Sequence, residues 1–379
     1  MPPIVIDLRK ADDQRDVVHR AVEALAEGKL VAFPTETVYG LAASALSEAA
    51  VQRLHDVKGR PAGQPFTLAI KSADEVVDYV PDISVLEQRL ARRCWPGPLT
   101  LVLDDDHPDS AVKQLPASVR KLIAPQGTIG LRVPAHPAIL SVLRLSAGPL
   151  ALSSANRSGQ ADTVTAEAVV EALDGDVDMV LNDGACKFGQ PSSVVRVHDQ
   201  RLQVLRAGVF TEATLKRLSG FIALFVCTGN TCRSPMAEVM MQRRLADKLG
   251  CRIDELEDRG VMISSAGIAA MSGGRAAAEA VQVMAGRSLD LSRHESQPLS
   301  ERLTEYADLL LTMTRGHRDA IVAQWPDAAG RVHVLRGEGD ISDPIGGPLE
   351  LYEACAQQID AALESWVERI DPEQLTLRS

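Results

Sequence analysis

The sequence contains no long hydrophobic run. Its longest uninterrupted apolar stretch is Phe221 to Cys227, far short of the ~18 residues that indicate a membrane-spanning helix. The N-terminal residues also lack the basic segment followed by an apolar segment that marks a secretory signal. We therefore expect no membrane association and a cytoplasmic location.

Regular cysteine and histidine spacings are absent as well. The six cysteines stand at positions 94, 186, 227, 232, 251 and 355, and this irregular spacing argues against a disulfide scaffold and for reduced thiols. No Cys-x-x-Cys pair and no His-x-x-x-His pair occurs. A structural zinc site is therefore not expected, and we predict no metal bound by the protein alone.

An excess of basic residues is also missing. Lys and Arg number 40 against 51 Asp and Glu, which gives a net charge of −11 and argues against a protein that coats nucleic acid, although brief contact with one RNA is compatible with it. The length of 379 residues favours two domains of roughly 100–200 residues each. We place them at residues 1–210 and 221–379, with a linker at 211–220.

Both halves combine strands with helices. In the first half, a helix is expected at residues 12–27 and apolar strands at 30–33, 66–70, 99–103, 128–133 and 193–197. This pattern predicts an α/β domain with a twisted mixed sheet. In the second half, strands at 221–226, 261–264, 309–313 and 332–335 are separated by helical stretches, which predicts a doubly wound parallel sheet.

The strongest local signal is the segment from Cys227 to Pro235, between a buried strand and an apolar-periodic helix. A loop that closes onto a helix N-terminus points backbone N–H groups inward, and Gly229 and Asn230 tolerate positive φ. Such a loop binds an anion, and Arg233 can donate two hydrogen bonds to phosphate oxygens. Because the helix terminus and the guanidinium favour the thiolate of Cys227, that residue is a candidate nucleophile.

This segment resembles the low-molecular-weight protein tyrosine phosphatase family over roughly residues 221–370, including Ser265-Ala266-Gly267 and Asp343-Pro344. The resemblance implies hydrolysis of phosphoproteins without a cofactor. It also implies roles for five residues: Cys227 attacks phosphorus, Arg233 holds the phosphoryl oxygens, Asp343 is the general acid, Ser234 stabilises the departing thiolate, and Asn230 holds the shape of the loop.

Two further loop residues suggest specificity and redox control. Thr231, together with Ile345-Gly346-Gly347 after the Asp-Pro pair, is similar to the bacterial protein-arginine phosphatase branch of that family. The resemblance implies phosphoarginine as substrate, with phosphotyrosine as the alternative. Cys232 is either the partner of Cys227 in a reversible disulfide or a small packing residue.

The first half carries an ordered set of polar motifs. Lys58-Gly59-Arg60-Pro61 places two cations two residues apart, which suits a polyphosphate. The whole set resembles the YrdC-like threonylcarbamoyl-AMP synthases over nearly all of residues 5–210. Its other members are Phe33 to Leu41, Trp95 to Thr100, Thr128 to Pro134, Ser153 to Asn156, Gly189 to Ser193 and Leu205 to Gly208.

That resemblance implies synthesis of threonylcarbamoyl-AMP and pyrophosphate from L-threonine, bicarbonate and ATP. The product would serve tRNA modification at adenosine 37 through a separate threonylcarbamoyl-transfer complex. Magnesium is expected with ATP. The residues implied to contact threonine are Thr35, Arg132, Ser154 and Ser192, and those implied to hold ATP are Lys58, Arg60, Thr128, Asn156 and Arg206, with Lys58 also catalytic.

One departure from the synthase pattern affects the threonine site. Some synthases carry a histidine at the end of the strand that follows Lys-x-Arg-Pro, where this chain has Ala69. Two hypotheses therefore stand. In the first, the chain is a bifunctional enzyme, a synthase fused to a phosphatase. In the second, the first half is a non-catalytic nucleotide-binding or RNA-binding module, and only the phosphatase is active.

Overall fold

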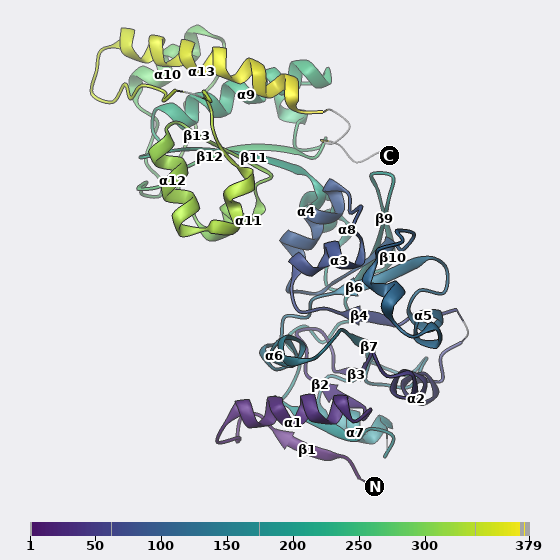
Figure 1. The fold of residues 1–379 in the computed structure, drawn as a ribbon. Helices are drawn as coiled ribbons and strands as arrows, with labels where there is room; N and C mark the ends of the chain where they lie inside the picture. The colour runs from purple at the N-terminus through teal and green to yellow at the C-terminus, as the bar shows by residue number, and fades with distance from the viewer. Residues whose placement is uncertain (1, 62, 174, 338, 372–374, 376–379) are drawn as a thin grey trace. The chain divides into compact units, whose positions relative to one another are not determined.

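A computed structural model describes residues 2–61, 63–173, 175–337, 339–371 and 375. The chain divides into two units, residues 1–218 and 219–379, and Figure 1 follows it through both. Each unit has its own sheet. Among the helices in the described ranges, none combines the length and the apolar character needed to span a membrane.

The first unit is built on a ten-stranded mixed sheet with the order β1-β8-β2-β3-β7-β4-β6-β5-β9-β10. β1 and β2 pair with β8 in parallel, as β4 does with β6 and β5 with β9, and the other neighbours are antiparallel. This confirms the predicted twisted mixed sheet. The strands are β1 (Ile4–Asp7), β2 (Val31–Phe33), β3 (Gly40–Ser44), β4 (Thr67–Ala69), β5 (Leu99–Asp104), β6 (Thr128–Arg132), β7 (Leu150–Ser154), β8 (Met179–Asn182), β9 (Ser193–His198) and β10 (Arg201–Arg206).

Several helices of the first unit begin at recognisable caps. Asp13 and Ser47 cap two of them, and Ser84 and Glu87 form a reciprocal capping box at a third, which satisfies backbone N–H groups that have no partner within the helix. The helices are α1 (Gln14–Ala26), α2 (Glu48–Lys58), α3 (Val76–Tyr79), α4 (Val85–Cys94), α5 (Ala117–Ile123), α6 (Pro137–Leu145), α7 (Ala166–Leu173) and α8 (Glu212–Ser219), with 3₁₀ turns at Ala73–Glu75 and Ala111–Gln114. The proposed linker, 211–220, thus contains α8.

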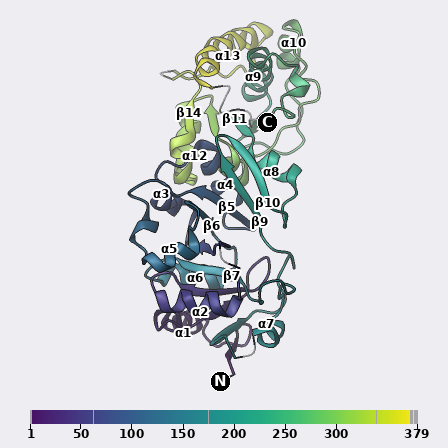
Figure 2. The same cartoon turned by 90° about the vertical axis from the view of Figure 1, so that its right-hand side faces the viewer.

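β9 and β10 form a tight hairpin, visible side by side in Figure 2. The two turn residues, Asp199 and Gln200, have φ values of 50° and 61°. Positive φ at both central residues matches the right-handed twist of the paired strands. The hairpin ends at Arg206, one of the predicted ATP ligands.

The second unit has a four-stranded sheet with the order β12-β11-β13-β14, and all three pairings are parallel. This confirms the predicted doubly wound parallel sheet. The strands are β11 (Phe221–Cys227), β12 (Val261–Gly267), β13 (Leu309–Thr312) and β14 (Val332–Val334).

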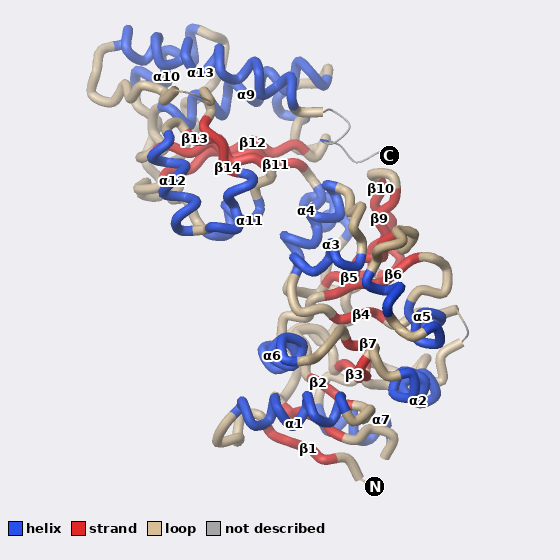
Figure 3. Tube along the Cα trace, viewed as in Figure 1, coloured by secondary structure: helices blue, strands red, loops and turns tan. Residues whose placement is uncertain are grey.

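Helices cover both faces of this sheet (Figures 1 and 3). Because side chains alternate along a strand, Ala223 and Phe225 of β11 pack on one side, and Leu224 and Val226 pack on the other. α9, α10 and α13 cover the first side, and α11 and α12 cover the second. The helices are α9 (Arg233–Leu249), α10 (Ala278–Gly286), α11 (Glu301–Tyr306), α12 (Arg315–Gln324) and α13 (Leu349–Arg369), with 3₁₀ turns at Ile253–Glu255 and Pro326–Arg331.

Candidate active sites

In the second unit, the loop after β11 turns back on the cysteine that precedes it. Cys227 ends β11, and α9 begins at Arg233. The backbone N–H of Asn230 donates to Cys227 Sγ at 3.2 Å, and Ser234 Oγ lies 3.0 Å from the same sulfur. Asn230 has a φ of 56°, whereas Gly229 does not take a positive φ. The sulfur is thus the centre of a short curved loop at a helix N-terminus.

Asn230 is held by several separate segments. Its side-chain Nδ2 donates to Ser234 Oγ at 3.0 Å and to Ser265 Oγ at 2.8 Å. Its Oδ1 accepts from the backbone N–H of Gln297 at 2.9 Å, and its backbone oxygen lies 2.8 Å from His294 Nε2. These bonds hold a non-glycine residue in the left-handed region, which costs free energy without such support.

Arg233 lies between the loop and the predicted general acid. Its Nη2 is 2.5 Å from Asp343 Oδ2 and 3.5 Å from Thr228 Oγ1, and its Nη1 donates to the backbone oxygen of Ile341 at 3.4 Å. Arg233 is buried, while the Asp343 side chain is 42% exposed. The structure therefore brings Cys227, Arg233 and Asp343 into one site, with the carboxylate on its open side.

Glu238 lies behind the loop and carries no recognisable signal in the sequence. Ser265 Oγ donates to Glu238 Oε2 at 2.5 Å, and burial raises the pKa of this glutamate to about 7. A Cβ atom on Gly267 would lie 2.5 Å from the backbone oxygen of Thr228. Only glycine allows β12 to approach the loop this closely. Spacing within the motif predicts neither contact.

The sulfur of Cys232 is buried between two hydroxyl groups. Tyr352 OH lies 3.5 Å from it and Thr231 Oγ1 lies 3.6 Å from it. All six cysteines are free thiols in this structure. Burial is the largest cause that raises the pKa of Tyr352. The phenol therefore stays protonated and can donate to the sulfur.

In the first unit, Lys58 joins the predicted residues after β7. Its Nζ donates to the backbone oxygens of Ser154, at 2.6 Å, and Asn156, and to Asn156 Oδ1 at 3.0 Å. Ser154 Oγ in turn donates to Asn156 Oδ1 at 2.5 Å. Burial, followed by the neighbouring charge of Arg60, lowers the pKa of Lys58 to about 7. Three acceptors nevertheless match the three donors of an ammonium group.

Two arginines complete a cationic group near Lys58. Arg60 donates to Ser153 Oγ at 2.7 Å and stacks over the Phe66 ring at 4.6 Å. Arg206 donates to Ser192 Oγ at 3.0 Å. Burial is the largest cause that lowers the pKa of Arg60, to about 10, and the charge of Arg206 adds to it. Cations close enough to depress one another's pKa values are suited to a polyphosphate.

Two of the four residues predicted to contact threonine, Thr35 and Arg132, form a second cluster, whereas Ser154 bonds to Lys58 and Ser192 to Arg206. Thr35 Oγ1 lies 2.8 Å from Thr37 Oγ1, and Arg132 Nη2 donates to Thr37 Oγ1 at 2.9 Å. The same Nη2 is 2.6 Å from Glu36 Oε1, while Glu36 Oε2 accepts from the backbone N–H of Ala135 at 2.8 Å. In the sequence, Glu36 is only a carboxylate near a turn. In the structure it fixes the guanidinium expected to bind the threonine carboxylate.

Strand register relates the remaining predicted residues. Thr67 of β4 pairs with both Gly130 of β6 and Leu152 of β7, so Thr128 and Ser154 lie at the same level of the sheet. Within the described part of the chain, no hydrogen bond joins the Thr128 side chain to the other predicted residues. The predicted ATP contact at Thr128 therefore rests on its place in the sheet.

Ala69 pairs with Arg132 across β4 and β6. Paired residues in a sheet present their side chains on the same face. A histidine at position 69 would thus share a face with the predicted ligand of the threonine carboxylate. In this chain the position is fully buried and belongs to the apolar core.

No group of three or more His, Cys, Asp or Glu side chains within the described ranges could hold a metal ion. Burial is the largest cause that lowers the pKa of both Lys58 and Arg206, and the charge of Asp162 opposes this lowering at each. Cations dominate this site, so a magnesium ion there would be held mainly by ATP phosphates.

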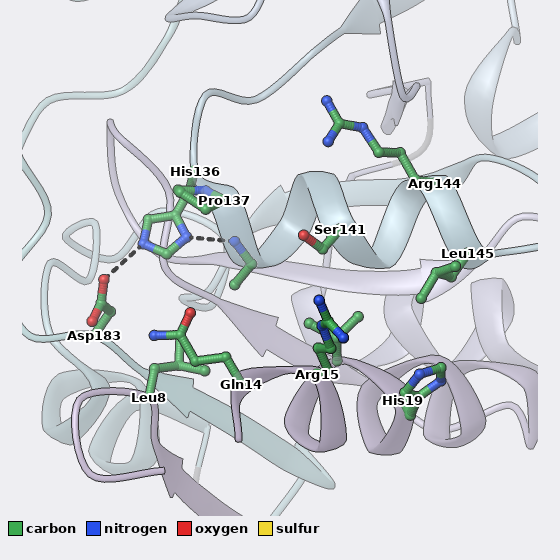
Figure 4. Close-up of a pocket in the computed structure, with 12 residues that line it drawn as sticks. Leu8, Gln14, Arg15, His19, His136, Pro137, Ser141, Arg144, Leu145 and Asp183 are labelled. Carbon is green, nitrogen blue, oxygen red and sulfur yellow. Dashed lines mark hydrogen bonds and ion pairs between the residues drawn. The ribbon is translucent and has the colours of Figure 1, made fainter. Parts of the chain in front are cut away.

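A separate pocket of 510 Å³ lies between α1 and α6 in the first unit (Figure 4). At one end His136 Nε2 lies 3.1 Å from Asp183 Oδ2, and its Nδ1 accepts from the backbone N–H of Ala138 at 3.2 Å. Both ring nitrogens are therefore occupied, one in capping α6 and the other in the contact with Asp183. None of the residues predicted to bind ATP or threonine lines this pocket.

Comparison with known proteins assigns each unit to a family. Residues 23–208 match the Sua5, YciO and YrdC family, whose description is "Telomere recombination". Residues 223–375 match the family described as "Low molecular weight phosphotyrosine protein phosphatase". Together these matches include every predicted site residue.

Individual relatives agree with this division. The threonylcarbamoyl-AMP synthase of Pyrococcus abyssi is 34% identical over 266 residues, 67% of this chain and 75% of that protein. The protein-arginine-phosphatase of Geobacillus stearothermophilus is 34% identical over 156 residues, 40% of this chain and 97% of that protein. The crystal structure of P. abyssi Sua5 complexed with L-threonine matches with a TM-score of 0.51 and 26% identity, over 69% of this chain and 92% of that one. The chain thus belongs to the YrdC/Sua5 family through its first unit and to the low-molecular-weight phosphatase family through its second.

Proposed function

We propose that the chain is a bifunctional cytoplasmic enzyme. The first unit would form threonylcarbamoyl-AMP and pyrophosphate from L-threonine, bicarbonate and ATP, for transfer to tRNA by a separate complex. The second would hydrolyse phosphoarginine in proteins through a cysteine nucleophile. The free state of all six cysteines supports the cytoplasmic location.

The arrangement of Lys58, Ser154 and Asn156 carries the synthase proposal. These residues are joined by hydrogen bonds, and the electrostatic coupling among Lys58, Arg60 and Arg206 indicates a compact cationic group. Such a group would hold the triphosphate and stabilise the leaving pyrophosphate. When bound with ATP, Mg²⁺ would neutralise further charge on those phosphates.

The chemistry of adenylate formation requires mainly positioning. A carboxylate oxygen of N-carboxy-threonine would attack the α-phosphorus, and the bond to pyrophosphate would break. Arg132 would bind the threonine carboxylate, held in place by Glu36 and Thr37. Thr35 and Ser192 would line the amino-acid end of the site.

The Cys227, Arg233 and Asp343 arrangement carries the phosphatase proposal. Phosphoryl oxygens would enter the loop and bind Arg233 in place of Asp343. Cys227 Sγ would attack phosphorus while Asp343 protonates the leaving nitrogen or oxygen. Water, deprotonated by Asp343, would then hydrolyse the thiophosphate, and Ser234, 3.0 Å from the sulfur, would stabilise the departing thiolate.

Thr231 supports phosphoarginine over phosphotyrosine. The Thr231 hydroxyl lies close to Gly229, since a Cβ atom on that glycine would be 3.6 Å from Thr231 Oγ1. Its hydrogen-bond neighbour is Cys232 Sγ, a weak acceptor. The hydroxyl thus has capacity for a guanidinium N–H of the substrate. The variant Thr231→Ile should reverse the preference between phosphoarginine and phosphotyrosine; an unchanged ratio of kcat/KM values contradicts the role of Thr231.

Pyrophosphate release tests the synthase directly. The Cys227→Ser protein, supplied with ATP, magnesium and bicarbonate, should release pyrophosphate only when L-threonine is added, with threonylcarbamoyl-AMP detected by mass. Folded protein that binds ATP without releasing pyrophosphate would instead favour the alternative, in which the first unit is a non-catalytic nucleotide or RNA module. An RNA-binding assay then shows whether this non-catalytic unit is a nucleotide-binding module or an RNA-binding module.

A further inference from the structure

A buried histidine on α12 contacts the loop that surrounds Cys227. His317 is 6% exposed, and its Nε2 lies 2.9 Å from Thr228 Oγ1. The same hydroxyl oxygen lies 3.5 Å from Arg233 Nη2. Thr228 therefore stands between an imidazole and the guanidinium that would bind the phosphoryl group.

The hydrogen-bonding capacity of these groups gives the chain of contacts a direction. Arg233 can only donate, so Thr228 Oγ1 accepts from it. The Thr228 hydroxyl hydrogen then needs an acceptor, and His317 Nε2 is at the right distance. This places the remaining proton of the neutral ring on Nδ1, which has no hydrogen-bond partner among the described residues although it is buried.

The location of the ring favours this neutral form. Burial is the largest cause that lowers the pKa of His317, and the charge of Arg233 on α9 lowers it further, while Asp340 and Asp343 in the loop after β14 act in the opposite direction. A neutral ring accepts from the threonine hydroxyl. A protonated ring would instead donate to it and place a second cation close to Arg233.

We propose that His317 is a positioning residue of the phosphatase site, whose neutral imidazole orients the Thr228 hydroxyl toward Arg233 and so holds the guanidinium ready for the phosphoryl group. The proposal rests on the proposed phosphatase function. It adds a residue from the opposite face of the sheet to a site otherwise formed by the loop, α9 and the Asp343 segment.

Substitutions at both ends of the contact test it. His317→Leu removes the acceptor, and Thr228→Val removes the hydroxyl. Each should lower kcat/KM for p-nitrophenyl phosphate by about tenfold, the size expected for loss of one hydrogen bond next to a charged group, mostly through KM. The double variant should be no worse than either single one. His317→Gln, whose amide oxygen can accept from Thr228, should recover activity to within about threefold.

The pH profile separates orientation from simple packing. Wild-type kcat/KM should fall as His317 becomes protonated, at a pH below the ordinary histidine value of about 6.5, and this limb should be missing in His317→Gln. His333→Gln is the matched control, because burial also lowers the pKa of His333 but its ring packs on Trp366 at 5.3 Å. The control should keep the wild-type profile.

Binding of inorganic phosphate to the Cys227→Ser protein, measured by calorimetry, distinguishes this proposal from the function on which it rests. A wild-type protein that hydrolyses no phosphoester and no phosphoarginine would refute the proposed function. Phosphate binding weakened about tenfold by His317→Leu and restored by His317→Gln would still support the positioning role. Folded His317→Leu protein with kcat/KM and phosphate affinity within twofold of its parent, or additive losses in the double variant, would overturn it.

Discussion

Arg233 Nη2 lies 2.5 Å from Asp343 Oδ2, so the group that would bind the phosphoryl oxygens is paired, before substrate arrives, with the group that would protonate the leaving atom. An incoming phosphoryl group and the carboxylate compete for one guanidinium. Substrate binding and release of the general acid are therefore coupled through Arg233.

This competition predicts opposite effects of one substitution on binding and turnover. Asp343→Asn removes the charge that competes with phosphate but also removes the proton donor. In the Cys227→Ser background it should tighten binding of inorganic phosphate several-fold. In the active protein it should lower kcat by about 10²–10⁴-fold. Calorimetry and steady-state kinetics measure the two effects, and weaker phosphate binding would contradict the competition.

Glu238 predicts a pH-dependent stability. Its pKa is raised to about 7 in the folded state, above that of an unfolded glutamate, so the unfolded state releases its proton first. The buried carboxyl group therefore lowers the free energy of unfolding as the pH rises. This loss is absent in acid, grows above about pH 4.5 and levels off above about pH 7, where it reaches up to about 3 kcal/mol at 1.36 kcal/mol per pKa unit. Glu238→Gln should remove it and raise the melting temperature at pH 8 more than at pH 5.

The exposed Glu364 on α13 provides the control for this measurement. Glu364→Gln should change the melting temperature equally at both pH values. If Glu238→Gln behaves in the same way, the carboxyl group is not buried in the manner described.

Gly267 predicts a steric effect on the phosphate loop. A methyl group there would lie 2.5 Å from the backbone oxygen of Thr228, so Gly267→Ala must displace the loop. We expect a loss of about 1–3 kcal/mol in unfolding free energy and at least a tenfold loss in phosphate affinity. Gly286→Ala is the matched control, since a Cβ atom at that glycine would have open space around it, and it should stabilise α10 by up to about 1 kcal/mol.

Glu36 predicts a selective effect on threonine. Glu36→Gln keeps an acceptor for the backbone of Ala135 but removes the charge that holds Arg132. The KM for L-threonine should rise at least tenfold, because Arg132 is no longer held in place, while the KM for ATP stays within about twofold. Both are measured by pyrophosphate release. The exposed Glu27→Gln should change neither. Equal effects on both substrates would show that Glu36 supports the whole site rather than the amino-acid end.

The two activities should be separable. Cys227→Ser should abolish phosphatase turnover and leave adenylate formation intact, and Lys58→Ala should do the reverse, with at least a 100-fold loss of adenylate formation for removal of a charge that acts on a leaving pyrophosphate. Both activities are measured on the same full-length preparations. A single substitution that disables both would refute the assignment of two independent sites.

The sequence predicts those elements whose signal lies within a few consecutive residues. The segment from Cys227 to Pro235 and the apolar runs at β5, β6, β9 and β11 carry their signal within a few positions, so the loop and the sheet type are recognisable. β3 and β7 are not predicted as strands, because runs of Ala and Ser in Gly40–Ser44 and Leu150–Ser154 do not distinguish a buried strand from a turn.

Contacts between distant segments cannot be predicted in this way. Glu36, Glu238 and His317 act on residues that are 96, 27 and 89 positions away. One expectation within the loop is also too broad, since Asn230 takes a positive φ and Gly229 does not. The side chain of Asn230 explains this, because an amide can be fixed by hydrogen bonds where glycine offers none.

The bonds around Asn230 also bear on how sequence variation in such proteins is interpreted. Ser265, His294 and Gln297 touch this one residue, although they lie outside the segment from Cys227 to Pro235. A variant at any of them can therefore impair catalysis while the motif itself remains intact. A survey that checks only Cys227 to Pro235 would count such a chain as an active phosphatase.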